Sequence, residues 1–156
     1  MTGRVTTGGW LKLLAFVALI LLVGFLIGHA SDPKAAYAAF RKPWFAPPAW
    51  VFGPVWSVLY IMIAIAGWRL HERDPASPEM RLWWSQLALN FLWSPVFFMA
   101  EGRGAALVII LALLILLLTL VGRLWRDDRT TMLLLVPYAG WVAFATLLNA
   151  AIVSLN

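Results

Sequence analysis

The sequence contains no cysteine. This absence excludes disulfide bonds, thiolate metal sites and a cysteine nucleophile, and it leaves the redox compartment undetermined. Charged residues are also scarce, at 12% of the 156 residues, whereas hydrophobic residues make up 63%. With a mean hydropathy of +0.85, the chain has too few polar residues to cover a soluble fold. It is typical of a multi-pass integral membrane protein.

The formal net charge is +5, but the basic residues lie in short runs between apolar segments and form no basic face. This pattern indicates loops near anionic membrane lipid and no nucleic-acid partner. Eight of the twelve lysines and arginines are expected on the same side of the membrane as the N-terminus, near the N-terminus itself and around the loops after the second and fourth predicted helices. They are Arg4, Lys12, Arg69, Arg73, Arg81, Arg123, Arg126 and Arg129. The positive-inside rule therefore predicts a cytoplasmic N-terminus, on the assumption of a bacterial cell membrane.

Five segments reach the roughly 20 mainly apolar residues that a membrane-spanning helix needs. They lie at about 10–28, 49–68, 82–100, 104–122 and 131–154. Apolar runs of this length without strict alternation are not barrel strands, and only helices and closed barrels satisfy the backbone within lipid. We therefore expect one all-α domain over residues 1–156, a bundle of five transmembrane helices.

The connection between the first two predicted helices, residues 29–48, is long for a compact bundle and rich in aromatic residues. Its prolines favour an extended approach, so the second helix is expected to begin near Ala49. Tyr37 and Phe40 are spaced to press one face onto the bundle. The segment is either a solvated connector or a lid, and the density of rings favours a lid over a pocket.

Two predicted helices carry one-sided stripes of aromatic and polar residues. At 100° per residue, the second helix aligns Phe52, Trp56, Tyr60 and Ile63, and the third aligns Trp83, Gln86, Asn90, Ser94 and Phe97. Amides in hydrocarbon cost roughly 2 to 7 kcal/mol unless hydrogen-bonded, so Gln86 and Asn90 are expected to face the interior. There they either clamp neighbouring helices or contact a ligand.

The fifth predicted helix places Tyr138, Ala145 and Asn149 on one face, with Trp141 about 60° to one side. Neither His29 nor His71 has a histidine or carboxylate at helical ligand spacing, so no metal site is predicted.

Three blocks of sequence together point to a known family. The first comprises Lys42-Pro43, Pro47-Pro48, Trp50, Gly53-Pro54-Val55-Trp56 and Leu59-Tyr60. The second comprises residues 86–90 and 93–98, and the third comprises Pro137-Tyr138, Trp141, residues 143–146 and Leu148-Asn149. In order and spacing they resemble the TspO/MBR family of tryptophan-rich sensory proteins, which includes the mitochondrial translocator proteins, once called peripheral benzodiazepine receptors.

The resemblance implies a membrane protein whose interior binds protoporphyrin IX or haem, and benzodiazepine-type or isoquinoline ligands, with no cofactor required. Carried over residue by residue, its ligand-binding residues are Tyr37, Phe52, Trp56, Tyr60, Asn90, Phe97, Trp141 and Ala145, with Tyr138 and Asn149 adjacent. The leading hypothesis is a sensor or regulator of porphyrin metabolism and stress.

Two other functions remain open. Bacterial relatives degrade protoporphyrin under light, and Trp56 and Trp141 match the tryptophans implicated as catalytic, so a porphyrin-degrading enzyme is one alternative. A tetrapyrrole or lipid transporter is the other. No conventional acid, base, nucleophile or metal accompanies these residues in the sequence.

We further expect a homodimer. Gly24 and Gly28 form a GxxxG pair that permits close helix approach, either inside the bundle or at a dimer seam. Arg41 and Lys42 either meet ligand propionates or anchor lipid headgroups. Cholesterol is not an expected partner, because alanines and a serine occupy the C-terminal region where animal members of the family have a proposed cholesterol motif.

Overall fold

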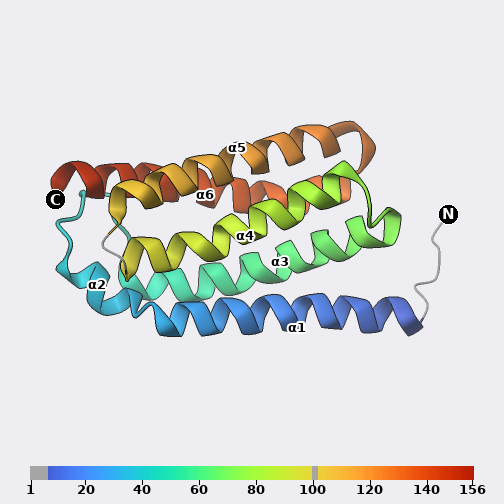
Figure 1. The fold of residues 1–156 in the computed structure, drawn as a ribbon, viewed down its shortest axis with the longest axis horizontal. Coiled ribbons are helices and arrows are strands. Elements are labelled where there is room, and N and C mark those ends of the chain that lie inside the picture. The colour runs from blue at the N-terminus through green and yellow to red at the C-terminus, as the bar shows by residue number, and fades with distance from the viewer. Residues whose placement is uncertain (1–6, 100–101) are drawn as a thin grey trace.

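The computed structural model describes residues 7–99 and 102–156, which form six α-helices and no β-strand (Figure 1). The elements in chain order are α1 (Thr7–Ala30), α2 (Pro33–Ala39), the short 3₁₀ helix η1 (Ala49–Val51), α3 (Phe52–Arg73), α4 (Pro78–Phe98), α5 (Arg103–Asp127) and α6 (Arg129–Leu155). The long helices run along one axis, and α2 lies at the end where α1 stops and α3 begins. The C-terminus lies at that same end.

The prediction of a bundle of five transmembrane helices is wrong. Within the described residues, four helices are long and apolar enough to cross a membrane: Gly8–Ala30, Ala49–Arg73, Arg103–Asp127 and Arg129–Leu155. Helix α4 is not among them, because its amides, serines, prolines and tryptophans make it less apolar than its length suggests. The remaining helix is α2, which at seven residues is far too short to span.

Most helices extend a turn or so beyond the predicted segments into the charged flanks. Helix α3, for example, continues through His71 to Arg73. Helix α4 begins at Pro78, where the Ser77 hydroxyl accepts a hydrogen bond from the Met80 amide at 3.1 Å, the usual arrangement of an N-cap. The predicted end of the third segment at residue 100, and Arg4 of the charge count, lie outside the described residues.

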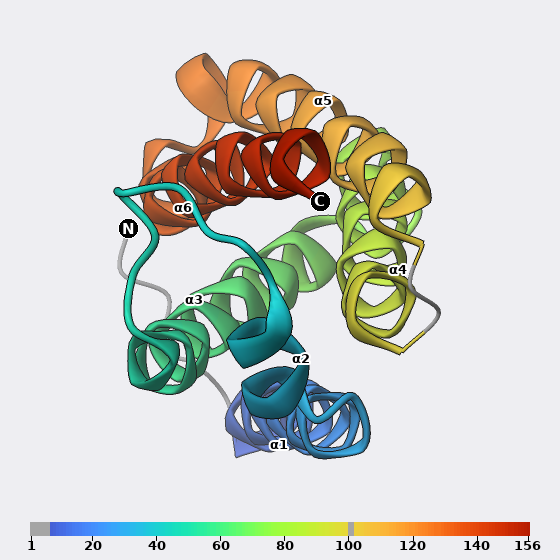
Figure 2. The ribbon, with the colours of Figure 1, turned by 90° about the vertical axis from the view of Figure 1, so that its left-hand side faces the viewer.

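Seen from the end that carries α2, the bundle has α1 on one side and α5 and α6 on the other, with α3 and α4 between them (Figure 2). The segment that follows α2 crosses over the end of α6 before it reaches α3. Reciprocal hydrogen bonds fix this crossing: the Arg41 amide donates to Asn156 Oδ1 at 3.0 Å, and Asn156 Nδ2 donates to the Arg41 carbonyl at 3.0 Å. The connection is therefore tied to the C-terminal helix.

The centre of the bundle is organised around Trp83, whose side chain is fully buried. Its indole nitrogen donates to the Ile63 carbonyl of α3 at 3.1 Å. The ring fits only because residue 67 is glycine, since a Cβ there would lie 2.2 Å from the ring. The contact between Gly67 and Trp83 therefore sets the distance between α3 and α4 at this level.

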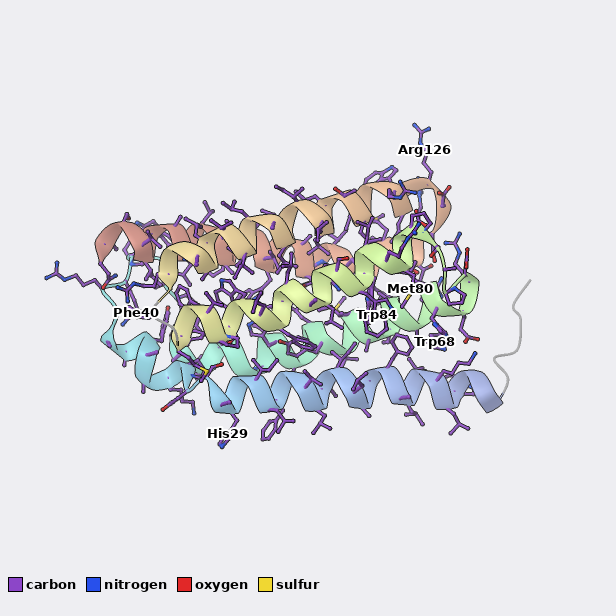
Figure 3. All side chains as sticks on the ribbon, viewed as in Figure 1. His29, Phe40, Trp68, Met80, Trp84 and Arg126 are labelled. Carbon is purple, nitrogen blue, oxygen red and sulfur yellow. The ribbon has the colours of Figure 1, made fainter. Side chains whose placement is uncertain are left out.

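Ion pairs join the helices at the end of the bundle opposite α2. Lys12 pairs with Glu72 at 2.8 Å, linking α1 to α3, and Arg123 pairs with Glu79 at 2.6 Å, linking α5 to α4. The hydrogen bond from Arg123 lowers the pKa of the Glu79 carboxyl. Figure 3 shows Arg126 projecting outward at this same end. These ion pairs therefore join the helices in two pairs at this end of the bundle.

The turn between α5 and α6 is held by Asp128. Its carboxylate accepts hydrogen bonds from the amide and hydroxyl of Thr131, at 3.1 and 2.6 Å, and pairs with Arg69 and Arg73, each at 3.1 Å. Burial alone would raise the pKa of Asp128, but the bonds from Thr131 and Arg69 outweigh it and lower the pKa to about 2. One carboxylate therefore fixes the ends of three helices.

Candidate functional site

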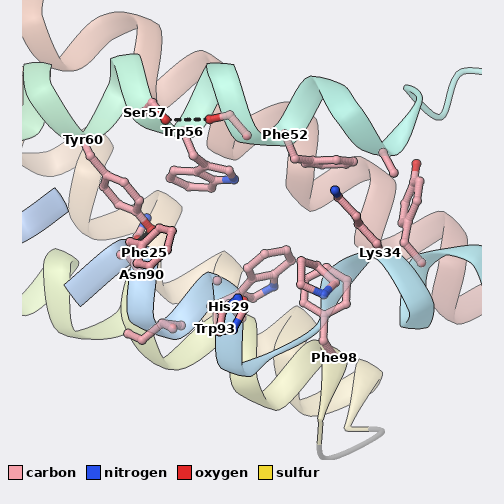
Figure 4. Close-up of a pocket in the computed structure, with 18 of the residues that line it drawn as sticks. Phe25, His29, Lys34, Phe52, Trp56, Ser57, Tyr60, Asn90, Trp93 and Phe98 are labelled. Carbon is pink, nitrogen blue, oxygen red and sulfur yellow. Dashed lines mark hydrogen bonds between the residues drawn. The ribbon is translucent and has the colours of Figure 1, made fainter. Parts of the chain in front are cut away.

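An apolar cavity of about 580 Å³ lies near the end of the bundle that carries α2 (Figure 4). Its walls come from the C-terminal half of α1, from α2 and η1, from the first turns of α3, and from the last turns of α4. Figure 4 shows the rings of Phe52 and Trp56 on one side, facing those of Trp93 and Phe98 on the other. The site is therefore a space between aromatic walls.

Five of the ten residues predicted from the resemblance line this cavity. They are Tyr37, Phe52, Trp56, Tyr60 and Asn90. The α3 members share the inward face that helical periodicity assigned to them. Trp56 stacks on Tyr60 with ring centroids 5.2 Å apart, so these two rings form one continuous wall.

The other five predicted residues are not among those that line the cavity. They are Phe97, Tyr138, Trp141, Ala145 and Asn149. Most of them pack directly behind the walls.

Aromatic contacts define this second layer. Trp141 meets Phe52 edge-on with centroids 5.9 Å apart, and Tyr138 meets Trp56 edge-on at 6.2 Å. Phe97, which is 3% exposed, stacks on Trp93 at 5.1 Å. These contacts fix the rings that face the cavity.

Sequence reasoning missed several lining residues, among them Phe25, Lys34, Trp93 and Phe98. Trp93 and Phe98 stand inside the second family-like block, and that position was the available signal. Phe25 offered none, because α1 is apolar on every side and its periodicity marks no face.

A chain of hydrogen bonds leads from the cavity into the core. The Tyr60 hydroxyl donates to Asn90 Oδ1 at 3.2 Å, Asn90 Nδ2 donates to the Tyr138 hydroxyl at 2.9 Å, and that hydroxyl donates to Gln86 Oε1 at 2.8 Å. Gln86 is fully buried, and its Nε2 has no hydrogen-bond partner among the described residues. The chain joins α3, α4 and α6.

These bonds bear on the two uses considered for the amides. Gln86 clamps α4 to α6 and lies away from the cavity. Asn90 also clamps α4 to α6, but unlike Gln86 it borders the cavity, beside Tyr60. Since the hydroxyl proton of Tyr60 is already donated to Asn90, the polar atoms at this point are held in one orientation.

A second bonded pair supports the opposite wall. The Trp93 indole donates to Asn149 Oδ1 at 3.1 Å, and Asn149 Nδ2 donates to the Arg103 carbonyl at 3.1 Å. Asn149 thereby ties α6 to the first turn of α5 and orients the Trp93 ring.

Helix α2 covers the cavity through Tyr37. The Tyr37 hydroxyl donates to the Pro47 carbonyl at 2.9 Å, and its ring meets Phe52 edge-on at 5.2 Å. Burial raises the pKa of this hydroxyl. The Tyr37 side chain therefore ties α2 to Pro47, near the end of the connection, and to Phe52 in the first turn of α3.

Within residues 7–99 and 102–156, no three histidine or carboxylate side chains come together as a metal site requires. The ring of His29 stacks on Phe25 with centroids 6.0 Å apart, and the ring of His71 lies 5.7 Å from Phe16.

Comparison with known proteins agrees with the motifs. Residues 16–155 match the TspO/MBR family. Similar relatives include the tryptophan-rich protein TspO of Archaeoglobus fulgidus, 39% identical over 94% of this chain and 97% of that protein. The tryptophan-rich sensory protein of Cereibacter sphaeroides is 32% identical over 83% and 82% of the two chains. The human translocator protein is 35% identical over 72% and 70%.

Proposed function

The chain belongs to the TspO/MBR family, and from this premise we propose that it binds a tetrapyrrole, protoporphyrin IX or haem, as a sensor or regulator of porphyrin metabolism and stress. It is an integral membrane protein, as its four long apolar helices and its family indicate. The names of its relatives, sensory protein and translocator protein, support a membrane sensor or translocator role.

The single observation that carries the proposal is the shape and lining of the cavity. Its volume of about 580 Å³ falls within the range of roughly 300 to 1,000 Å³ that small-molecule sites occupy. Aromatic rings on opposite walls favour a flat apolar ligand, which stacks on them without ordering flexible side chains. Tyr60 and Asn90 supply fixed polar atoms at one place on the wall, as binding sites of this class require.

Light-dependent degradation of the bound porphyrin is a second candidate function, favoured by the position of Trp56 in the wall. Trp141, the other tryptophan assigned to it, packs behind Phe52. Under this arrangement, Trp56→Phe should change the products formed from illuminated protoporphyrin IX, whereas Trp141→Phe should change them less. Identical products from both variants and from wild type would leave only photochemistry in solution.

Binding itself is tested by titrating the purified protein in lipid nanodiscs with protoporphyrin IX. We expect saturable quenching of tryptophan fluorescence, reversed by a benzodiazepine-type or isoquinoline competitor. Quenching that rises linearly with porphyrin, and equally in empty nanodiscs mixed with free tryptophan, would contradict the proposal. The expected homodimer and the cytoplasmic N-terminus stay predictions.

A further inference from the structure

The connection between α1 and α3 carries three cationic side chains, Lys34, Arg41 and Lys42. The amine of Lys42 is fully used: it donates to the carbonyls of Tyr37 and Phe40 at 2.9 and 3.0 Å, and it lies 5.1 Å from the centroid of the Tyr37 ring. It therefore caps the end of α2. The expectation that Lys42 meets a ligand does not fit this geometry.

Arg41 does not fit that role either, because its side chain is not among those that line the cavity. Its backbone is bonded to Asn156 at the crossing over α6. Of the two cations that the sequence suggested as ligand anchors, Lys42 is bonded to the end of α2, and Arg41 does not line the cavity.

Lys34 occupies the position that they lack. It follows Pro33 in the first turn of α2, and Figure 4 shows its amine directed into the cavity beside Phe52. Among the described residues that line the cavity, it is the one lysine or arginine, and no aspartate or glutamate accompanies it. No ion pair in the described part of the chain involves Lys34 or the neighbouring Asp32.

This placement determines what kind of ligand fits. The deeper walls are aromatic, so an ionised group would lose its hydration there without a partner, at high cost. At the mouth, a single amine beside low-dielectric walls attracts an anion more strongly than the same amine in open water. An apolar body deep in the cavity and an acid at the mouth satisfy both conditions.

We propose that Lys34 pairs with a carboxylate of the ligand, so that the cavity selects flat apolar molecules with an acidic edge. This inference rests on the proposed tetrapyrrole binding and adds the residue that recognises the acid. It assigns the Lys34 amine to a carboxylate of the bound ligand and not to a lipid headgroup, although an anionic headgroup could also pair with the amine.

The test compares protoporphyrin IX, a diacid, with its dimethyl ester, which has the same ring and no charge. Both are titrated into nanodiscs of zwitterionic phosphatidylcholine that contain wild type, Lys34→Met, Lys34→Arg or the control Arg41→Met. Lys34→Met should weaken binding of the diacid by roughly 3- to 10-fold, the size expected for a partly solvated charge pair. It should leave binding of the ester unchanged, and Lys34→Arg and Arg41→Met should resemble wild type.

Four outcomes would overturn the proposal. Equal losses for diacid and ester in Lys34→Met would make the residue a shape contact, and equal losses in Lys34→Met and Arg41→Met would make the effect general electrostatics. A third outcome is that Lys34→Met binds the diacid as wild type does, but is less thermally stable than wild type when anionic phosphatidylglycerol replaces phosphatidylcholine in the nanodiscs. This result would assign the amine to lipid. Binding of neither compound to wild type would instead overturn tetrapyrrole binding itself, and the anchor with it.

Discussion

The ring of Tyr60 lies against the backbone of Gly24, so close that a Cβ at residue 24 would be 2.5 Å from Cε2 of the tyrosine. Gly24 was expected to serve either packing inside the bundle or a dimer seam, and this contact is packing inside the bundle. Its partner in the GxxxG pair, Gly28, would meet nothing within 4 Å and borders the cavity. The two glycines therefore have different roles.

Gly24→Ala should destabilise the protein and weaken ligand binding together. The added methyl group must displace either α1 or the Tyr60 ring, and overpacking of this kind typically costs about 1 to 3 kcal/mol. Displacing the ring also breaks its hydrogen bond to Asn90. Thermal unfolding and porphyrin titration in nanodiscs measure the two effects.

Gly140→Ala is the matched control for this variant, because residue 140 is exposed on α6 and an added Cβ meets nothing within 4 Å. It should leave binding unchanged and raise stability slightly, since alanine favours a helix over glycine by roughly 0.5 to 1 kcal/mol. A Gly24→Ala protein as stable as this control would contradict the close contact.

Tyr138→Phe should be among the more damaging conservative changes in the core. The hydroxyl both accepts from Asn90 and donates to Gln86, so its removal leaves two buried polar atoms without partners, at about 1 to 3 kcal/mol each. Adding Gln86→Leu removes one of them together with the unpartnered Nε2. The double variant should therefore be more stable than the sum of the two single changes predicts, in a double-mutant cycle of unfolding free energies. Strict additivity would show that the chain of bonds is not cooperative.

Sequence reasoning located the inward faces of the helices better than it located the cavity. Periodicity placed Phe52, Trp56 and Tyr60 on one face of α3, and the cost of burying an amide placed Asn90 inside; all four border the cavity. The angle around a helix does not say which neighbour stands in between, and Phe52 separates Trp141 from the space.

Two further differences have different origins. The first lies in composition, which the sequence contains, and the second lies in contacts that one sequence segment does not show. Helix α4 was counted as a span on its length, although its polar stripe leaves it less apolar than the other long helices. The sequence suggests that Lys42 either meets ligand propionates or anchors lipid headgroups, but its amine donates to the backbone carbonyls at the end of α2. Lys34 lines the cavity, but nothing in the sequence marks the mouth of a cavity.

Trp56→Ala should weaken protoporphyrin binding by roughly tenfold, because an aromatic contact of this kind contributes on the order of 1.5 kcal/mol. Trp125→Ala is the control, since Trp125 is 56% exposed on the last turns of α5 and does not line the cavity. Affinity is followed through the absorbance of the porphyrin, so that loss of a fluorescent tryptophan does not affect the readout. Equal affinities for the two variants would remove Trp56 from the site.

Asp128 makes the stability of the protein depend on acid pH. Its pKa is lowered to about 2 in the folded protein from an ordinary value of 3.8, so the unfolded chain takes up the proton first as pH falls. The stabilisation by this carboxylate is therefore complete above about pH 5, declines as pH falls below 3.8, and is lost near pH 2, with a total on the order of 2 kcal/mol.

Asp128→Asn should be less stable than wild type at pH 7, and the difference between the two proteins should shrink as pH falls from 5 to 2. The asparagine keeps the shape of the side chain but cannot pair with Arg69 and Arg73 as an anion. Asp127→Asn is the control, because Asp127 is exposed beside this turn and makes no ion pair in the described part of the chain. Unfolding midpoints between pH 2 and 7 give the comparison. A stability difference between Asp128→Asn and wild type that stays constant across this range would show that the carboxylate acts through its shape and hydrogen bonds and not through its charge.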